Sequence, residues 1–204
     1  MFLQGLRVVV RRLKRADLKQ MAAWRPFDDP LLAEANWPQR SLVELDRWYS
    51  RCSRDPQRLL CAVADRSGQV IGSITLRERS GRRSARLGIT LGADFVNQGL
   101  GTEALALFLD YYFGELGFKK LVLDVVGYNR RAIRVYRKLG FVKVDQRERA
   151  VGREKKWVFL DDAAYADARR FFRRDWLGRH WLLCYDMELK REDWQQVRAN
   201  LVKW

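Results

Sequence analysis

The chain has 204 residues, of which 48% are hydrophobic; this excludes a disordered chain and predicts a single domain over residues 1–204 with a real core. Its 40 Lys and Arg against 25 Asp and Glu give a formal net charge of +15. A surface with this charge attracts nucleic acid, the ribosome, an anionic membrane or a phosphorylated cofactor. The alternative is a solvated, arginine-rich surface with no such partner. No apolar run approaches the roughly 20 residues of a membrane span, and Met1–Leu13 lacks the pattern of a signal peptide.

The first half of the chain is expected to alternate helices and strands. The β-branched run at positions 8–10 predicts a first strand within Leu6–Leu13. A short helix follows, from Ala16 to Trp24, and Asp28-Asp29-Pro30 breaks it. The capping-box spacing of Ser41-Leu42-Val43-Glu44 predicts a helix running to about Cys52. Three more strands, the first two forming a hairpin, are expected at Leu59–Ala64, Val70–Leu76 and Ala85–Leu91.

The stretch Gln98-Gly99-Leu100-Gly101-Thr102 lies where a strand turns into a helix. The apolar run Leu87–Leu91 precedes it, and Glu103–Phe113 is apolar and long enough for a buried helix. Two glycines at a helix N-terminus leave backbone N–H groups accessible and add the positive end of the helix dipole. This predicts a phosphate-binding loop. The alternative is a tight turn that only allows close packing.

The second half continues the alternation. Gly117 is expected to end the long helix, and Gly140 is expected to cap a short helix that starts at Asn129. The remaining strands and the C-terminal helix are expected at Leu121–Val126, Phe141–Asp145, Trp181–Glu188 and Arg191–Trp204.

Residues 150–180 form an unexpected segment between the last two strands. Asp161-Asp162 could cap a helix through Trp176. Its apolar positions share one helical stripe: Tyr165, Ala168, Phe172 and Trp176. Several arginines fall elsewhere on that helix, so a basic helical insertion is predicted.

The run from Asn129 to Phe141 reads N-x-x-A-x-x-x-Y-x-x-x-G-F and follows the glycine loop by about thirty residues, with a strand between them. Together these two motifs strongly resemble the GNAT N-acetyltransferase superfamily. The opening residues Leu6-Arg7, Asp17 and Trp24 are similar to the branch that includes ribosomal-protein N-terminal acetyltransferases. The resemblance covers about Leu6–Val144 and then Trp181–Leu189.

This resemblance implies an α/β (α+β) fold with a mixed, mostly antiparallel sheet flanked by helices, interrupted by the helical insertion between the last two strands. It implies acetyl-CoA as cosubstrate, with no metal, and direct transfer of the acetyl group to an amine in a ternary complex. The pyrophosphate of CoA would bind backbone amides of Asn97, Gln98, Gly99, Leu100, Gly101 and Thr102. Ile89, Thr90 and Leu91 would offer backbone groups to the pantetheine arm, although they would be core strand residues in any case. Val96 departs from the family, which often has Gln or Arg there.

Two residues of the second motif are candidates for the site. In the family the tyrosine matched by Tyr136 protonates the departing thiolate, a role that suits a phenol; the alternative is a core aromatic residue. Asn129, two helical turns earlier, would fix cofactor or substrate, and it could also be the N-cap of the helix.

The proton acceptor is assigned to Asp124, directly or through water, because an amine must lose a proton before it attacks. Some relatives place a glutamate at this position, and many others use a glutamate where Arg86 stands here. The alternative for Asp124 is a salt bridge to a neighbouring Arg or Lys.

The chain has an odd number of cysteines, three, and they are widely spaced: Cys52, Cys61 and Cys184. This pattern indicates reduced thiols in a cytoplasmic protein. Cys184 is expected to be a buried small hydrophobic residue and not an acyl carrier. His180 is the single histidine, which argues against a zinc site; it is expected on the surface or in a loop, with substrate contact as the alternative.

The acceptor amine is left open between a protein N-terminus and a small molecule, an antibiotic included. The predicted insertion would be a lid or a homodimer contact, and its basic helix argues against a polyamine and tolerates an anionic or ribosome-bound acceptor. A competing hypothesis is a non-catalytic basic module that binds RNA or the ribosome.

Overall fold

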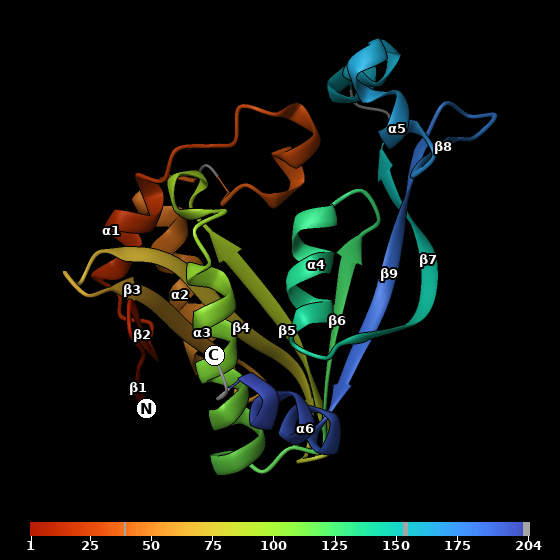
Figure 1. Ribbon diagram of the computed structural model, residues 1–204. Coiled ribbons are helices and arrows are strands. Elements are labelled where there is room, and N and C mark those ends of the chain that lie inside the picture. The colour runs from red at the N-terminus through yellow and green to blue at the C-terminus, as the bar shows by residue number, and fades with distance from the viewer. Residues whose placement is uncertain (39, 153–154, 202–204) are drawn as a thin grey trace. The chain divides into compact units, whose positions relative to one another are not determined.

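The computed structural model describes residues 1–38, 40–152 and 155–201 and divides the chain into two compact units. Unit 1 comprises Met1–Leu121 together with the C-terminal segment from Lys190, and unit 2 comprises Val122–Leu189. Figure 1 shows the elements of both units in sequence colours. No helix in the described part of the chain is long and apolar enough to cross a membrane.

Unit 1 is built on strands that follow one another in the sheet in chain order. These strands are β1 (Phe2–Gln4), β2 (Val8–Arg12), β3 (Leu59–Asp65), β4 (Val70–Ser80) and β5 (Ser84–Leu91). Each neighbouring pair is antiparallel. Val63 of β3 lies opposite Val10 of β2 and Gly72 of β4, and every residue of β3 up to Ala64 is buried. The β-branched run at 8–10 therefore forms the strand that its composition predicts.

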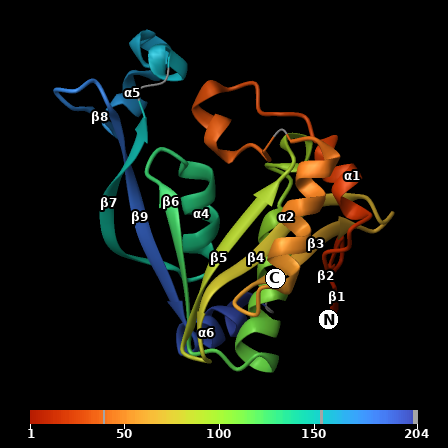
Figure 2. The same cartoon turned by 180° about the vertical axis from the view of Figure 1, so that it is seen from behind.

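Helices cover both faces of this sheet. They are α1 (Asp17–Ala22), α2 (Leu42–Arg54), α3 (Leu100–Asp110) and α6 (Arg191–Leu201), with 3-10 turns at Pro30–Ala35 and Ala93–Phe95 and a π-helical turn at Tyr111–Glu115. Figures 1 and 2 show α1 and α2 on one face and α3 on the other. On the α1–α2 side the core includes Met21, Trp24, Leu45 and Leu60.

Short-range signals in unit 1 give the predicted helix ends. Ser41 Oγ accepts the Glu44 N–H and the Glu44 carboxylate accepts the Ser41 N–H, so both halves of the capping box are present. A long-range contact fixes the C-terminal helix: buried Trp194 donates from its indole nitrogen to Asp110 Oδ1 at 3.0 Å, which anchors α6 to α3. The predicted end of α6 at Trp204 lies outside the described residues.

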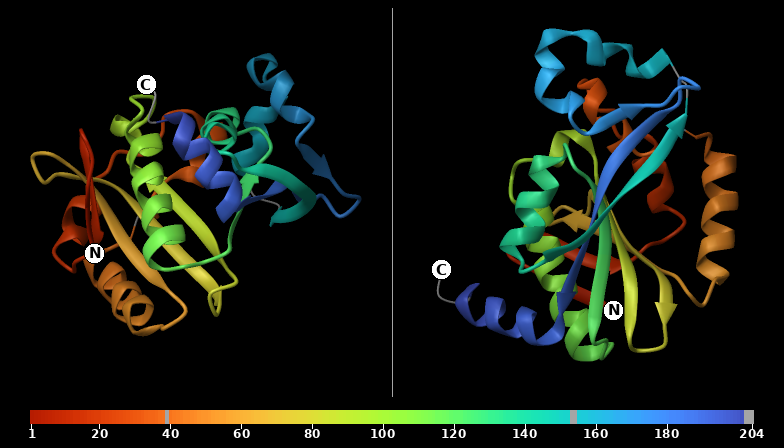
Figure 3. Two further views of the ribbon diagram at one scale, coloured as in Figure 1. Left: turned by 60° about the horizontal axis from the view of Figure 1, so that its bottom comes forward. Right: turned by 90° about the vertical axis from the view of Figure 1, so that its right-hand side faces the viewer.

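Unit 2 contains a second group of strands with one helix. It holds α4 (Arg130–Lys138), β7 (Val142–Gly152), β8 (Phe172–Arg174) and all but the ends of β6 (Lys120–Val126) and β9 (His180–Lys190), of which Lys120, Leu121 and Lys190 belong to unit 1. The order is β6-β9-β7, and β8 pairs with β9. The long antiparallel pair of β7 and β9 is clear in Figure 3. The expected mixed, mostly antiparallel sheet flanked by helices is confirmed.

The predicted helix from Asp161-Asp162 through Trp176 is wrong beyond Arg169. The segment forms 3-10 turns at Lys155–Asp161 and Ala163–Tyr165, a four-residue helix α5 (Ala166–Arg169), and then strand β8. Phe172 pairs with Leu182 of β9 and stacks on Tyr128 with ring centroids 5.5 Å apart. Strand pairing and this ring contact override the helical spacing of the apolar residues, and Trp176 is left 89% exposed in the turn after β8.

Candidate active site

The glycine loop of unit 1 has the backbone conformation that an anion-binding loop requires. Asn97 and Gly99 have positive φ values of 62° and 78°, and helix α3 starts at Leu100 directly afterwards. No side chain caps this helix start. Because the first N–H groups of a helix have no partner within the helix, they are oriented toward the exposed loop at 97–99.

Both glycines of the loop are needed for different reasons. The left-handed φ of Gly99 would strain any residue with a side chain. A Cβ atom at Gly101 would lie only 2.8 Å from Leu91 Cδ1, so this glycine allows the end of β5 to approach the first turn of α3. The loop therefore fits a phosphate-bearing cofactor that binds through backbone amides.

Arg7 also belongs to this loop. Its Nη1 donates to the Gln98 carbonyl at 2.8 Å, and its Nε donates to Glu103 at 3.0 Å. Glu103 also accepts the backbone N–H groups of Arg7 and Val8, so Arg7 both braces the loop and offsets the carboxylate of the first helical turn. Sequence reasoning used Arg7 only for the branch resemblance, because its 91-residue separation from Gln98 gives no local signal.

The end of β5 leads into the loop. Ile89, Thr90 and Leu91 pair with β4 opposite Ile74, Ser73 and Gly72. All three are partly exposed, whereas Ala85 and Leu87 earlier in the strand are buried. Val96, where the family often has a polar side chain, is partly buried before the loop, and Gln98 Nε2 donates to the Asp94 carbonyl at 2.8 Å.

In unit 2, Asn129 is the N-cap of α4. Its Oδ1 accepts the N–H of Ala132 at 3.1 Å, which confirms the structural alternative considered for this residue. The cap uses one side-chain oxygen and leaves the amide nitrogen for other partners.

Tyr136 lies two turns along the same helix and is almost fully buried, with 8% of its surface exposed. Its ring is tilted against Phe141, with centroids 5.7 Å apart. Burial raises the pKa of Tyr136 well above its usual 10, and the negative charge of Asp124 raises it further. The phenol therefore keeps its proton throughout the neutral range, and the two residues predicted for proton transfer interact electrostatically.

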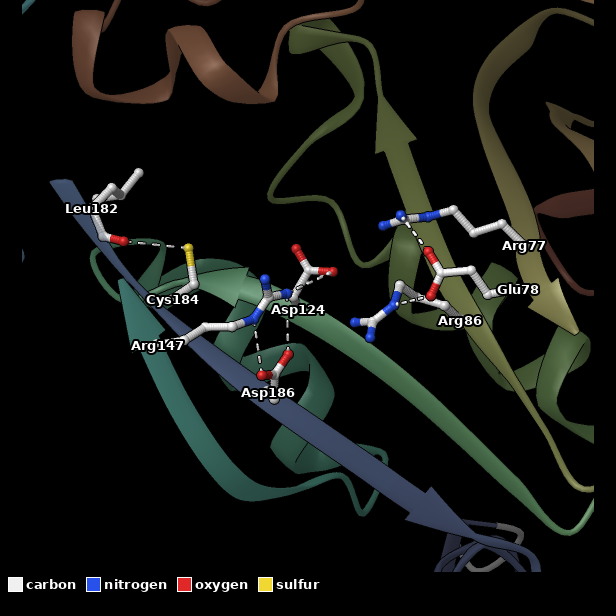
Figure 4. A network of polar contacts seen from close by, with 8 residues as sticks. All are labelled: Arg77, Glu78, Arg86, Asp124, Arg147, Leu182, Cys184 and Asp186. Carbon is white, nitrogen blue, oxygen red and sulfur yellow. Dashed lines mark hydrogen bonds and ion pairs between the residues drawn. The ribbon is translucent and has the colours of Figure 1, made fainter. Parts of the chain in front are cut away.

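The carboxylate of Asp124 lies in an arginine-bridged network. Arg147 Nη2 is 3.9 Å from Asp124 Oδ1, and Arg147 Nε is 3.0 Å from Asp186 Oδ2 (Figure 4). The salt bridge considered as the alternative for Asp124 is thus present. At 3.9 Å it is longer than the 3.0 Å contact of Arg147 with Asp186, and Arg147 was not singled out from the sequence.

Unit 1 contains a network of charged side chains around Glu78. Arg86, at the position where many relatives have a glutamate, donates to Glu78 Oε2 at 2.8 Å, and Arg77 lies 3.1 Å from Glu78 Oε1 (Figure 4). Glu78 has a φ of 53°, beside a register shift in the pairing of β4 with β5. A strained glutamate held by two arginines was not foreseen, because an irregular strand end has no sequence signature here.

Cys184 and His180 lie on β9. Cys184 is buried, its thiol donates weakly to the Leu182 carbonyl at 3.7 Å, and burial raises its pKa, so the thiol is protonated and unsuited to carry an acyl group. His180 belongs to the strand and not to a loop, and its Nδ1 is buried without a hydrogen-bond partner among the described residues. Within the described residues, all three cysteines are free and no group of His, Cys, Asp and Glu could hold a metal ion.

Comparison with known proteins agrees with this fold and these motifs. Residues 7–142 match the family described as the acetyltransferase (GNAT) domain. The spermidine N(1)-acetyltransferase of Escherichia coli K12 is 30% identical over 179 residues, which are 85% of this chain and 90% of that protein.

Two solved structures show the same fold. The spermidine N-acetyltransferase of Vibrio cholerae, solved in complex with CoA and spermine, is 22% identical with a TM-score of 0.67 and covers 92% of this chain and 98% of its own. A GNAT-family acetyltransferase from Bacillus anthracis is 15% identical with a TM-score of 0.65, covering 94% and 99%. The chain belongs to the GNAT acetyltransferase family and is an acetyl-CoA-dependent N-acetyltransferase.

Proposed function

We propose that this enzyme transfers the acetyl group of acetyl-CoA to a primary amine of a small molecule by direct attack. Acetyl-CoA supplies the thioester from which the acetyl group leaves. The backbone amides of Asn97–Thr102 would hold its pyrophosphate, and Ile89–Leu91 would offer backbone groups to the pantetheine arm and an N–H to the developing oxyanion. The left-handed Gly99 and the close approach at Gly101 support this assignment.

Proton transfer is assigned to unit 2. Tyr136 would donate the proton to the thiolate, and its raised pKa supports this role because the phenol is protonated at every physiological pH. Asp124 would accept the proton from the attacking amine, directly or through water. Arg147 would hold that carboxylate in place while bonding more closely to Asp186. Asn129 would position cofactor or substrate with its free amide group while capping α4.

A polyamine is the leading acceptor. The observation that carries this choice is the 30% identity to a spermidine N(1)-acetyltransferase over 90% of that protein. A basic helix through Trp176 would disfavour a polyamine, but this segment forms the short helix α5 and strand β8 instead. Two of its arginines are engaged locally: Arg173 binds Glu148, and Arg169 donates to the carbonyls of residues 160–162.

A protein N-terminus, as in the ribosomal-protein branch, is the second candidate. The net charge of +15 favours it, because a strongly basic enzyme repels a polycation at long range and attracts the anionic ribosome. A short Debye length limits that repulsion at physiological salt, where charges beyond about 8 Å are screened.

The deciding experiment is an acceptor panel with acetyl-CoA, read by thiol release and by mass spectrometry of the products. The panel contains spermidine, spermine, a monoamine, an anionic amine and peptides with free N-termini. We expect the highest kcat/KM for spermidine or spermine, with a single acetyl group on a primary amine. A preference for peptides or for the anionic amine would overturn the polyamine assignment and leave the enzyme class unchanged.

A further inference from the structure

Unit 1 contains a basic cavity that the acetyl-transfer reaction does not use. Its volume is about 360 Å³, and it is lined by Lys119, Lys120, Lys190, Arg191 and Glu192. Four of the five lining residues are lysine or arginine, and one is a glutamate. All five residues belong to unit 1.

The walls of this cavity are fixed by backbone hydrogen bonds. The N–H groups of Lys119 and Lys120 donate to the carbonyls of Arg82 and Arg83 at 3.1 Å each, which holds this segment on the turn between β4 and β5. The N–H of Arg191 in turn donates to the Lys119 carbonyl at 3.0 Å. The lysines are thus presented by ordered backbone and not by a free loop.

Arg191 has a structural task at the cavity. Its guanidinium donates to the carbonyls of Gly117 and Phe118, with 2.9 Å from Nε to the Phe118 oxygen. This fastens the start of α6 to the turn that ends at Lys119. Binding of a ligand is consequently left to the lysines, of which Lys119 and Lys190 are exposed and form no ion pair with any described residue.

The electrostatic field in the cavity favours a multiply charged anion. The 11-residue helix α6 starts at the cavity with its positive end, which Glu192 and Asp193 in the first turn partly offset. Arg82 and Arg83, both exposed, extend the positive potential along the neighbouring turn. Lysine binds phosphate as a point charge, and a cavity of this volume has room for more than one phosphate group.

This cavity is separate from the glycine loop. It lies beside the turn that leads into Ser84, the first residue of β5, whereas Leu91 at the other end of β5 leads to Gly99. A strand rises about 3.3 Å per residue, so the two places are separated by roughly 25 Å along β5. Figure 1 shows α6 at the same end of unit 1 as the turn between β4 and β5.

We propose that the cavity formed by Lys119, Lys120, Lys190 and Arg191 is a second anion site, which binds a small ligand carrying two or more phosphate groups. Glu192 limits the affinity and excludes anions with a single weak charge. Its limited volume of about 360 Å³ favours a compact ligand over a nucleic-acid backbone.

The test is isothermal titration of the full chain with inorganic pyrophosphate and tripolyphosphate in the presence of saturating CoA, so that the glycine loop is already occupied. We expect one equivalent to bind. The double substitution Lys119→Gln/Lys190→Gln should weaken binding at least about tenfold, since two charge-assisted contacts are lost. Glu192→Gln should strengthen it, and Lys19→Gln on α1, an equal loss of charge elsewhere in unit 1, should leave it unchanged.

Three outcomes would overturn the proposal. Pyrophosphate binding that disappears at saturating CoA, and that the lysine substitutions leave unchanged, would assign it to the glycine loop. Equal affinity in wild type and the double variant would remove the lysines from the site. Binding of single-stranded RNA, but of neither polyphosphate, that depends on these lysines would replace the small-ligand site with a nucleic-acid surface. If the double variant does not fold, Glu192→Gln and Lys190→Glu alone still give opposite expected changes in affinity.

Discussion

The guanidinium of Arg7 donates a hydrogen bond of 2.8 Å to the backbone carbonyl of Gln98. This contact joins the residue just before β2 to the glycine loop, and the same side chain pairs with the carboxylate of Glu103 in the first turn of α3. A cation at this place stabilises both the loop conformation and a negatively charged ligand bound to it. The loop in this enzyme is therefore supported by a residue far from it in sequence.

Replacement of Arg7 with Gln is expected to raise the KM for acetyl-CoA about fivefold to tenfold, or about 1 kcal/mol, with little change in kcat. The effect is modest because the Arg7 side chain is half exposed. Steady-state kinetics with varied acetyl-CoA measure it, and Arg51→Gln on the exposed side of α2 is the control. An unchanged KM would show that Arg7 has only a structural role.

The left-handed glycine of the loop can be tested against a glycine outside the loop. Gly99→Ala should lower the free energy of unfolding by about 1 kcal/mol, because the left-handed φ of 78° penalises a Cβ atom. It should also weaken acetyl-CoA binding, since strain relief moves the amides that we propose to hold the pyrophosphate. Gly114→Ala lies in the π-helical turn with nothing within 4 Å of the added Cβ, so it should not lower the free energy of unfolding and should leave acetyl-CoA binding unchanged. Urea unfolding and a thermal shift titration with CoA separate stability from binding.

The sequence predicts much of unit 1 because its signals are local. The capping box at Ser41, the β-branched run before Arg11 and the glycines of the loop each determine structure within a few residues. The insertion was mispredicted because Phe172 meets Tyr128 and Leu182, contacts that no helical periodicity reveals. Tertiary pairing decides such short apolar segments.

In the candidate site, too, residues in local motifs can be predicted from the sequence and residues in long-range contacts cannot. Asn129, Tyr136 and the glycine loop follow from motif spacing, since each motif lies within one local element. The contacts of Arg7 and Arg147 could not be predicted from motif spacing, because their partners Gln98 and Asp124 are distant in sequence. A single arginine also forms no recognisable pattern in a chain with 40 Lys and Arg. Charged partners at a site are a property of the fold and not of a motif.

Tyr136→Phe is expected to reduce kcat by about a hundredfold or more while the KM for acetyl-CoA changes little, because only the proton donor is lost. Packing against Phe141 should be retained, so thermal stability serves as the folding control. Because the pKa of Tyr136 is raised, the wild-type rate should not fall on the alkaline side until above pH 10 through loss of this proton. A variant with near wild-type kcat would assign Tyr136 to the core alone.

Asp124→Asn removes the proposed base and should lower kcat at least about tenfold, with the largest loss at low pH where the amine is most fully protonated. Asp186→Asn is the matched variant, because Asp186 shares Arg147 but has no assigned role in the reaction. It should leave kcat within about a factor of three, a change of less than 1 kcal/mol. Equal losses in the two variants would indicate that the arginine network, and not Asp124 as base, supports the activity.

Stability should fall steeply at alkaline pH because of groups that are protonated in the folded state. Burial raises the pKa of the Cys61 thiol from 9.0 to about 12, and burial also raises the pKa of Tyr112 above its usual 10. A raised folded-state pKa contributes stability that is complete below the unfolded-state pKa and is lost as the pH rises toward the folded-state pKa. Between pH 9 and pH 12 the Cys61 thiol alone should lower the free energy of unfolding by at most about 1.4 kcal/mol per pH unit.

Urea unfolding of wild type and Cys61→Ala at several values between pH 8 and pH 11 measures this contribution. The variant should start less stable, because it leaves a small cavity, and lose stability more slowly as the pH rises. Val63→Ala truncates the next buried residue on the same side of β3 without removing a titratable group. It should lower stability by a similar amount at every pH and retain the wild-type slope, so a slope unchanged in Cys61→Ala would contradict the raised pKa of the thiol.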